Sequence, residues 1–377
     1  MKDKGKKNVR AAVICGILST VWFVLAVCNR QAGHTVFSFP EFVKEEGYSE
    51  EHVMGSSSME DRAALQYTST GYRYPQQFEE VLEHYDSFRK LYHKELNVAV
   101  PGLAYTRLTN SASSQMVPQG ICLAGEYMLL TAYDREGGSN SVMYVLKEGV
   151  DGERRLLTVL ELPEKNHAGG IAYDGTYVWI ARSTTGYLGA ISYETVQKAA
   201  ASGQKSVRLT AYDQNIPVGV TASFVTYYKE RLWVGTFRSV LDGPGSLSSY
   251  RVEGAGEELR LRREATMKIP SYVQGALFLS QDGGVCLILA ASSGRYMDSK
   301  IYFYRFSDPG GVPTIRLLDQ YRFPPMVETL ASDGRNTYFL FESAATCYST
   351  LRYQKCVYPV DRVFGIPNRS LLCGILP

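Results

Sequence analysis

A repeat of about fifty residues, which recurs five times after residue 96, constrains the fold of this chain more than any other feature. Each copy begins with small residues, continues through a short apolar strand and a turn, and reaches a second, strongly apolar strand. Two more strands then follow, and four strands in about fifty residues are the period of a propeller blade. The copies begin 50, 49, 56 and 54 residues apart, at Gln119, Gly169, Val218, Gln274 and Glu328.

The fifth copy differs from the others because it ends after three strands. Its third strand is expected at 362–366, and no room is left for a fourth. An apolar stretch at 98–108 precedes the first copy, so we expect it to complete the last blade and close the ring, which removes exposed sheet edges. The sequence thus predicts an all-β fold, a β-propeller of about five four-stranded blades. Six blades, an open sandwich and two smaller β domains are the alternatives. Third strands are expected at 141–146, 189–193, 246–252 and 300–306, and fourth strands at 156–162, 207–212, 259–269 and 315–323.

The N-terminus predicts export. Residues 1–10, a basic cytoplasmic tail, carry five basic residues and one acid, and the run 11–28 is uncharged. As a helix this run would extend roughly 27 Å, close to the thickness of a bilayer core. A transmembrane signal anchor, a cleaved signal peptide and lipidation of Cys28 are the alternatives, and all export the remainder because the positive charges precede the run. We expect a single-pass cell-membrane protein with its propeller outside the cytoplasm, or a secreted protein after cleavage.

A spacer and a helix are expected between the anchor and the repeats. Residues 29–74 mix charges, glycine and serine without periodicity. Within 75–96, apolar residues recur at three- and four-residue steps, which predicts one amphipathic helix over about 76–94, ahead of a propeller over 97–377. We expect the helix to pack against the propeller. Binding to a membrane surface is the alternative, and it is disfavoured because the polar face has as many acids as bases.

Charge and motif content exclude several function classes. The net charge is +2 and residues 1–10 carry +4, which leaves −2 for the rest and no electrostatic footprint for nucleic acid. The sequence has no C-x-x-C pair, G-x-S-x-G elbow, H-E-x-x-H helix or Walker A loop. Cys347 and Cys356 bracket a short loop and are candidates for a disulfide outside the cell, with free thiols as the alternative.

The propeller topology predicts where a ligand would bind. Innermost strands begin at the face to which the loops between second and third strands return, so two distant sets of residues should converge around the central opening. Four of the five loops bring an arginine, whose planar fork suits carboxylate, phosphate or sulfate oxygens. This favours an anionic or glycan-like ligand; the alternative is that each arginine pairs with a nearby acid. The candidates are Gln119, His167, Gln274 and Glu328 from the strand starts, and Asp134, Arg135, Arg182, Arg238, Arg295 and Glu342 from the loops.

Catalysis and metal binding have few candidates. His167 is the only histidine after residue 93, and with Glu328 it is a candidate acid or base; a hydrogen bond that stabilises its loop is the alternative role. Gln119, Gln274 and Glu328 would offer oxygens to Ca²⁺ in the channel, although ordered water would satisfy them equally well. We therefore expect no cofactor, with calcium as the weaker alternative.

Four motifs mark the construction of the first two blades: Pro118-Gln119-Gly120-Ile121, the segment 167–172, Asp174-Gly175 and the segment 177–180. With these motifs the chain resembles an exported β-propeller family of Gram-positive bacteria over roughly residues 97–367. More loosely, the blades are similar to lactonases of the gluconolactonase and paraoxonase type. That similarity implies six blades and a Glu/Asn/Asp calcium site, of which only Glu328 has a counterpart here. Two functions follow: a binding module for an anionic or glycan-like ligand or a protein partner, or a hydrolase or lyase acting on such a ligand.

Overall fold

The computed structural model describes residues 77–100, 116–281, 284–348 and 356–375. All of them belong to one compact unit, 54–377. The predicted basic tail, signal anchor and spacer lie outside the described residues. Within those ranges, no helix is both long and apolar enough to cross a membrane.

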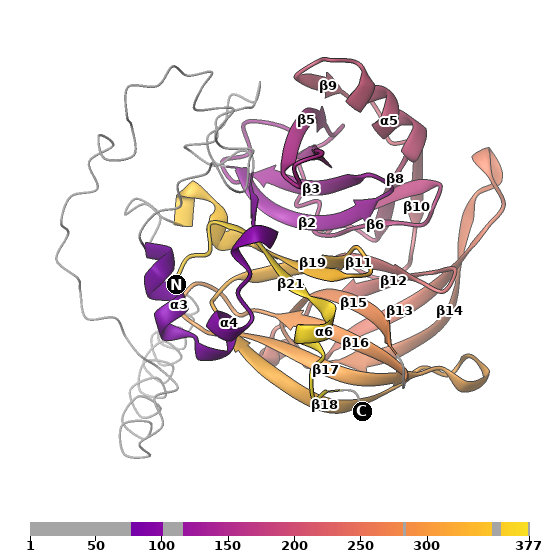
Figure 1. The fold of residues 1–377 in the computed structure, drawn as a ribbon. Coiled ribbons are helices and arrows are strands. Elements are labelled where there is room, and N and C mark those ends of the chain that lie inside the picture. Colours follow the sequence, from indigo (N-terminus) through magenta and orange to yellow (C-terminus); the bar gives the residue numbers. More distant parts are fainter. Residues whose placement is uncertain (1–76, 101–115, 282–283, 349–355, 376–377) are drawn as a thin grey trace, which may run out of the picture. The chain divides into compact units, whose positions relative to one another are not determined.

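Five four-stranded antiparallel units form the blades of a propeller, as the repeat predicts (Figure 1). The innermost strands β2, β6, β11, β15 and β19 contact one another in this order, and β19 contacts β2 to close the ring. The first blade is β2 (Met116–Ala124), β3 (Tyr127–Asp134), β4 (Val142–Glu148) and β5 (Arg154–Glu161). The second is β6 (Ile171–Tyr173), β7 (Tyr177–Ala181), β8 (Tyr187–Ser192) and β10 (Gln214–Pro217). The third is β11 (Phe224–Tyr228), β12 (Arg231–Thr236), β13 (Gly245–Glu253) and β14 (Arg260–Ile269). The fourth is β15 (Val273–Gln281), β16 (Gly284–Ala291), β17 (Ser299–Ser307) and β18 (Thr314–Phe323). The fifth is β19 (Val327–Ser332), β20 (Asn336–Phe341), β21 (Arg362–Pro367) and β1 (Val98–Ala99).

The last blade is completed from the N-terminal side, which confirms the predicted ring closure. Strand β1 pairs antiparallel with β21, with Val98 opposite Val363. Only two residues of the predicted 98–108 strand form this pairing, and 101–115 are not among the described residues. The fifth blade is therefore built from both ends of the repeat region, with its fourth strand contributed by residues that precede the first blade in the sequence.

Glycines at the starts of the innermost strands allow the blades to approach the axis closely. A Cβ on Gly120 would lie 3.1 Å from the backbone nitrogen of Ile171, and one on Gly170 would lie 2.9 Å from the Cα of Phe224. A Cβ on Gly275 would lie 2.8 Å from the Cα of Thr329. The recurring small residues of the repeat thus have a physical cause, which is contact between the backbones of neighbouring blades.

The second blade departs from the prediction. The fourth strand expected at 207–212 does not pair within this blade; β9 (Ser206–Arg208) adds to the first blade, parallel to β5. The second blade is completed instead by β10, which pairs with β8. A helix that the strand pattern did not reveal, α5 (Tyr193–Ala201), carries the chain between them, capped by the side chain of Ser192. Because the segment around 206–208 crosses to the first blade, the fourth strand of the second blade forms later in the sequence than predicted, at β10.

The single amphipathic helix expected over 76–94 is wrong. The segment forms α3 (Gln77–His84), α4 (Asp86–Lys90) and a 3-10 turn, η2 (Lys94–Leu96). The break falls at Tyr85, whose hydroxyl donates a hydrogen bond of 2.6 Å to Asp298 in the fourth blade. Val81 and Phe88 are fully buried in a cluster with residues of the fourth and fifth blades. The C-terminal helix is α6 (Asn368–Leu371).

Candidate functional site

We call the end of the ring at which the innermost strands begin the front face, and the opposite end the back face. On the front face, residues from the first, second, fourth and fifth blades form what we call the axial cluster. Gln119 of β2 donates a hydrogen bond of 2.7 Å to the carboxylate of Glu342, which follows β20. The cluster consists of Gln119, Tyr133, Arg135, His167, Arg295, Glu328, Glu342 and Tyr348.

Glu328 is the most deeply buried acid of the axial cluster. Its exposed fraction is 4%, and its Oε2 has no hydrogen-bond partner among the described residues. Burial, and secondarily the charge of Glu342, raise the pKa of Glu328 well above its usual value. The environment therefore favours the protonated carboxyl, which can donate a hydrogen bond or a proton.

Glu342 is subject to opposing influences. Burial raises its pKa, whereas the hydrogen bond from Gln119 and the positive charges of Arg135 and Arg295 act in the opposite direction. These arginines follow β3 and β16, so they reach the acid from the first and fourth blades. Of the four loop arginines predicted to converge on the axis, Arg135 and Arg295 are the two whose charges act on Glu342.

An aromatic pair forms one side of the axial cluster. The rings of Tyr133 and His167 are stacked, with centroids 4.1 Å apart and an interplanar angle of 11°. His167 keeps an exposed edge, but the surrounding protein removes part of its hydration and lowers the pKa of its imidazole. Its loop is held by Asn166, whose side chain accepts a hydrogen bond from the backbone of Ala168. His167 is therefore a positioned imidazole that tends to stay neutral.

Arg135 is exposed at the rim and lies over the ring of Tyr348, 5.0 Å from its centroid. Tyr348 ends the 3-10 turn η7 (Thr346–Tyr348). The disulfide expected between Cys347 and Cys356 is not formed, and both side chains are buried. The thiol of Cys356 instead donates to the carbonyl of Arg295, which ties this segment to the fourth blade.

The remaining predicted residues do not join the axial cluster. Arg182 makes a two-pronged ion pair with Glu164 and a hydrogen bond of 2.6 Å to Asn215, so it holds its own blade together. Asp134 accepts hydrogen bonds from two backbone amides of its own turn. Arg238 is exposed, and its carbonyl accepts from the backbone of Tyr272. Gln274 is half-buried on β15.

A metal site is not assembled from acidic, histidine or cysteine side chains. Among the described residues, no three of these groups lie where they could hold an ion. Gln119 uses its amide nitrogen on Glu342 and on the carbonyl of Pro118. Calcium held by Gln119, Gln274 and Glu328 stays a prediction.

The predicted ligand-binding residues did not include the two tyrosines of the axial cluster. Tyr133 and Tyr348 belong to a chain with 27 tyrosines, most of which suit strand surfaces. Tyr133 stands beside the predicted Asp134 and Arg135, and that adjacency is the one signal that pointed to it. Nothing local distinguishes Tyr348.

The comparisons add little to this geometry. No protein-family model and no curated protein matches the chain. Among solved structures, it is similar to the crystal structure of Myxococcus xanthus glutaminyl cyclase, with 12% identity and a TM-score of 0.39 over 67% of this chain and 90% of that chain. A similarity this weak carries no argument about function. The resemblance to an exported family stays a prediction, and the five blades differ from the six that the lactonase similarity implies.

Proposed function

We propose that this chain is a binding module that holds a glycan-like ligand with one acidic group against the axial cluster. The observation that carries the proposal is the convergence of Arg135 and Arg295, from two blades, on the environment of Glu342. Arginine forks suit an acidic group, whereas carboxyl and amide groups such as Glu342 and Gln119 suit hydroxyls. The stacked pair of Tyr133 and His167 adds a flat surface beside them.

One acidic group fits this face better than several. Of the four loop arginines, Arg182 is already saturated by Glu164 and Asn215. The charge of Arg238 acts on Asp242, where it adds to the hydrogen bond from Ser239 in lowering the pKa of that acid, and Arg238 is not among the charges that act on Glu342. The two remaining arginines are partly offset by Glu342, so the local positive charge is small.

The propeller would bind this ligand outside the cytoplasm. We propose that residues 11–28 anchor the chain as a single membrane pass, or that they are removed on secretion. The support is the charge asymmetry around the apolar run. Protease added to intact cells would degrade an exposed propeller and spare a cytoplasmic one.

The binding test uses the full chain in detergent with D-glucuronate, D-glucose and acetate as probes. We expect saturable calorimetric binding of glucuronate, at least about tenfold weaker binding of the two partial probes, and a similar loss in Arg135→Gln/Arg295→Gln. Arg238→Gln is the matched control. Absence of glucuronate binding tighter than about 1 mM overturns this ligand class and leaves a protein partner on the same face as the alternative.

A hydrolase or lyase is the second candidate, and Glu328 is the observation in its favour. A buried carboxyl that tends to remain protonated beside another acid is a typical general acid, and the neutral imidazole of His167 is a candidate base. Turnover of 4-nitrophenyl β-D-glucuronide or D-glucono-δ-lactone that is lost in Glu328→Gln and in His167→Ala would establish it. Binding without turnover supports the binding module.

A further inference from the structure

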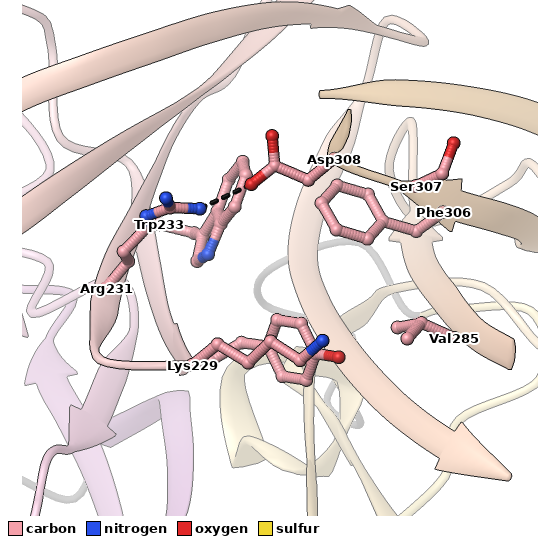
Figure 2. Close-up of a pocket in the computed structure, with 8 residues that line it drawn as sticks. Lys229, Arg231, Trp233, Val285, Phe306, Ser307 and Asp308 are labelled. Carbon is pink, nitrogen blue, oxygen red and sulfur yellow. Dashed lines mark hydrogen bonds and ion pairs between the residues drawn. The ribbon is translucent and has the colours of Figure 1, made fainter. Parts of the chain in front are cut away.

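A second candidate site lies on the back face, between the third and fourth blades. It is a pocket of about 320 Å³, within the size range of small-molecule sites. Strand β11 runs from the front face to Tyr228 and β12 returns from Arg231, which places the pocket at the end opposite the axial cluster. The residues that line it are Tyr228, Lys229, Arg231, Trp233, Val285, Phe306, Ser307 and Asp308 (Figure 2).

The apolar wall of this back pocket is aromatic and rigid. The rings of Trp233 and Phe306 have centroids 5.5 Å apart at 89°, and Tyr228 meets Phe306 at 87°. Phe278 stacks on Tyr228 from behind, with centroids 4.6 Å apart. Such mutually perpendicular rings fix one another, so the wall can accept an apolar ring without rearranging.

Two buried polar atoms of the pocket residues lack partners. Trp233 is 1% exposed, and its Nε1 has no hydrogen-bond partner among the described residues; the same holds for Oδ1 of Asp308. A buried donor left unpaired is unfavourable, because it has lost its hydrogen bonds to water without gaining a partner in the protein. A ligand that supplies an acceptor to Trp233 would remove this penalty.

The turn that carries Lys229 is strained. Lys229 and Glu230 form the two-residue connection between β11 and β12, with φ of +48° and +57°. Such turns normally use Asn-Gly, because other side chains are disfavoured at positive φ. The ammonium of Lys229 lies over the ring of Tyr228, 5.4 Å from its centroid. The turn thus holds a cation at the pocket at a cost to folding, a pattern found at functional sites.

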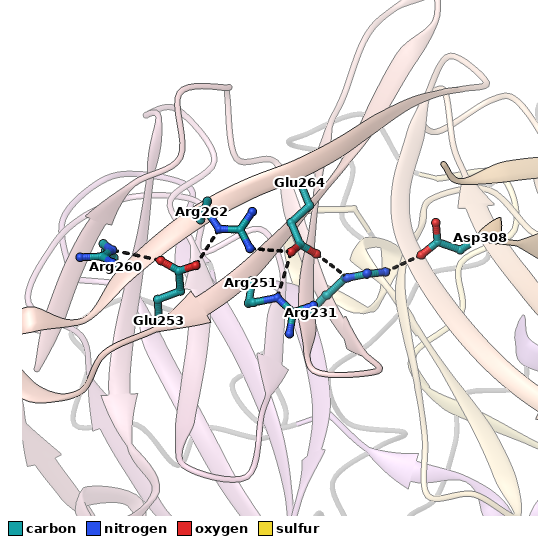
Figure 3. Close-up of polar contacts among 7 residues, drawn as sticks. All are labelled: Arg231, Arg251, Glu253, Arg260, Arg262, Glu264 and Asp308. Carbon is teal, nitrogen blue, oxygen red and sulfur yellow. Dashed lines mark hydrogen bonds and ion pairs between the residues drawn. The ribbon is translucent and has the colours of Figure 1, made fainter. Parts of the chain in front are cut away.

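The other cation of the pocket is already neutralised. Arg231 makes an ion pair with Asp308 (Figure 2) and another, at 2.6 Å, with Glu264 (Figure 3). Figure 3 shows that Glu264 also pairs with Arg251 and Arg262, and that Arg262 extends these ion pairs to Glu253. Arg231 therefore shapes the wall, and Lys229 is the charge available to a ligand.

We propose that the back pocket binds a small carboxylate with an apolar ring. The carboxylate lies between Nζ of Lys229 and Nε1 of Trp233, and the ring rests on Phe306 and Val285. The binding free energy comes from pairing the unpaired donor, from charge assistance by Lys229 and from burial of the ring. This site is separate from the axial cluster and does not rest on the proposed front-face function.

The test is calorimetric titration of the full chain in detergent with phenylacetate, and with 2-phenylethanol as its neutral analogue. We expect saturable binding of phenylacetate and at least about tenfold weaker binding of the alcohol, because the alcohol has no charge for Lys229. Lys229→Gln should weaken phenylacetate binding to the same extent. Lys268→Gln, an exposed lysine of β14, is the matched control.

A second readout reports on Trp233 directly. The chain has three tryptophans, and Trp233→Phe identifies the Trp233 indole N–H signal in a ¹⁵N spectrum by its loss. Phenylacetate should shift that signal and leave the Trp179 signal in place. Equal binding of acid and alcohol, unchanged affinity in Lys229→Gln, an unshifted Trp233 signal or no binding tighter than about 1 mM would each overturn the proposal.

Discussion

The two faces of the ring treat a partly or fully buried glutamate in opposite ways. On the front face, Glu328 lies near a second acid and its pKa is raised by burial. On the back face, the hydrogen bond from Arg251 and the charge of Arg231 lower the pKa of Glu264. The same residue type therefore tends to be neutral at one end and charged at the other. The difference shows that burial and the charged groups nearby, more than the residue type, determine the charge state.

Gly275→Val should have the largest effect, since it separates the innermost strands beneath the axial cluster. Its Cβ would lie 2.8 Å from the Cα of Thr329 and 3.0 Å from the carbonyl of Glu328. We expect a loss of about 3 kcal/mol in the free energy of unfolding, measured by urea denaturation. Gly186→Ala, whose new Cβ would stay 3.4 Å from its nearest neighbour, should change stability little. Equal stability of the two variants would contradict the close approach.

Arg231→Met should be the next most damaging, because it leaves Glu264 and Asp308 without the cation between them. We expect the free energy of unfolding to fall by about 2 kcal/mol at pH 7. The loss is smaller than for a fully unpaired acid, because Arg251 and Arg262 still pair with Glu264. A lowered folded pKa means that the native pairing stabilises the protein above the unfolded pKa of about 4.5. The difference from the parent chain should therefore fade below that pH, as urea denaturation at several pH values can establish.

Glu328→Gln should show the opposite dependence on pH. A raised folded pKa means that ionisation of Glu328 opposes folding as the pH rises above the unfolded value of about 4.5. The variant lacks this penalty, so it should gain about 1 kcal/mol over the parent at pH 7 and nothing near pH 4. A variant that is less stable than the parent at pH 7 would show that the carboxylate is needed by the fold.

Glu230→Gly should have the smallest effect, and it separates the backbone strain of the turn at the back face from ligand binding there. Glycine adopts the φ of +57° without strain, so the variant should be more stable by about 1 kcal/mol in thermal denaturation. Glu230 does not line the back pocket, so phenylacetate affinity should stay the same. Gly203→Ala, which introduces a side chain at a φ of +70°, should lower stability by a similar amount.

The features of the fold that the sequence predicted correctly depend on residues that recur at the same position in each blade. The spacing of Gln119, Gly169, Val218, Gln274 and Glu328 predicted five blades, and the missing fourth strand predicted closure by 98–108. Both depend on local patterns that recur in each blade. Where one copy deviates, as at α5 and β9, the prediction failed because an inserted helix moved the strand to another blade.

The candidate site was predicted less well, since its contacts join distant residues. Topology correctly brought Gln119 and Glu342 together across 223 residues. It did not reveal that Arg182 would pair with Glu164. The break at Tyr85 was equally hidden, because its partner Asp298 is 213 residues away.

Sequence alone determined the number of blades, the way the ring closes and the face on which the strands begin, because these follow from a period and from the alternation of apolar strands and turns. Tertiary structure alone decided which polar groups share a buried environment. Glu328 has one acid as its electrostatic neighbour, Glu264 has several arginines, and the indole nitrogen of Trp233 has no partner among the described residues. Desolvation and Coulomb energies depend on the distances between side chains on different strands, and those distances exist only after the strands have paired and the blades have packed.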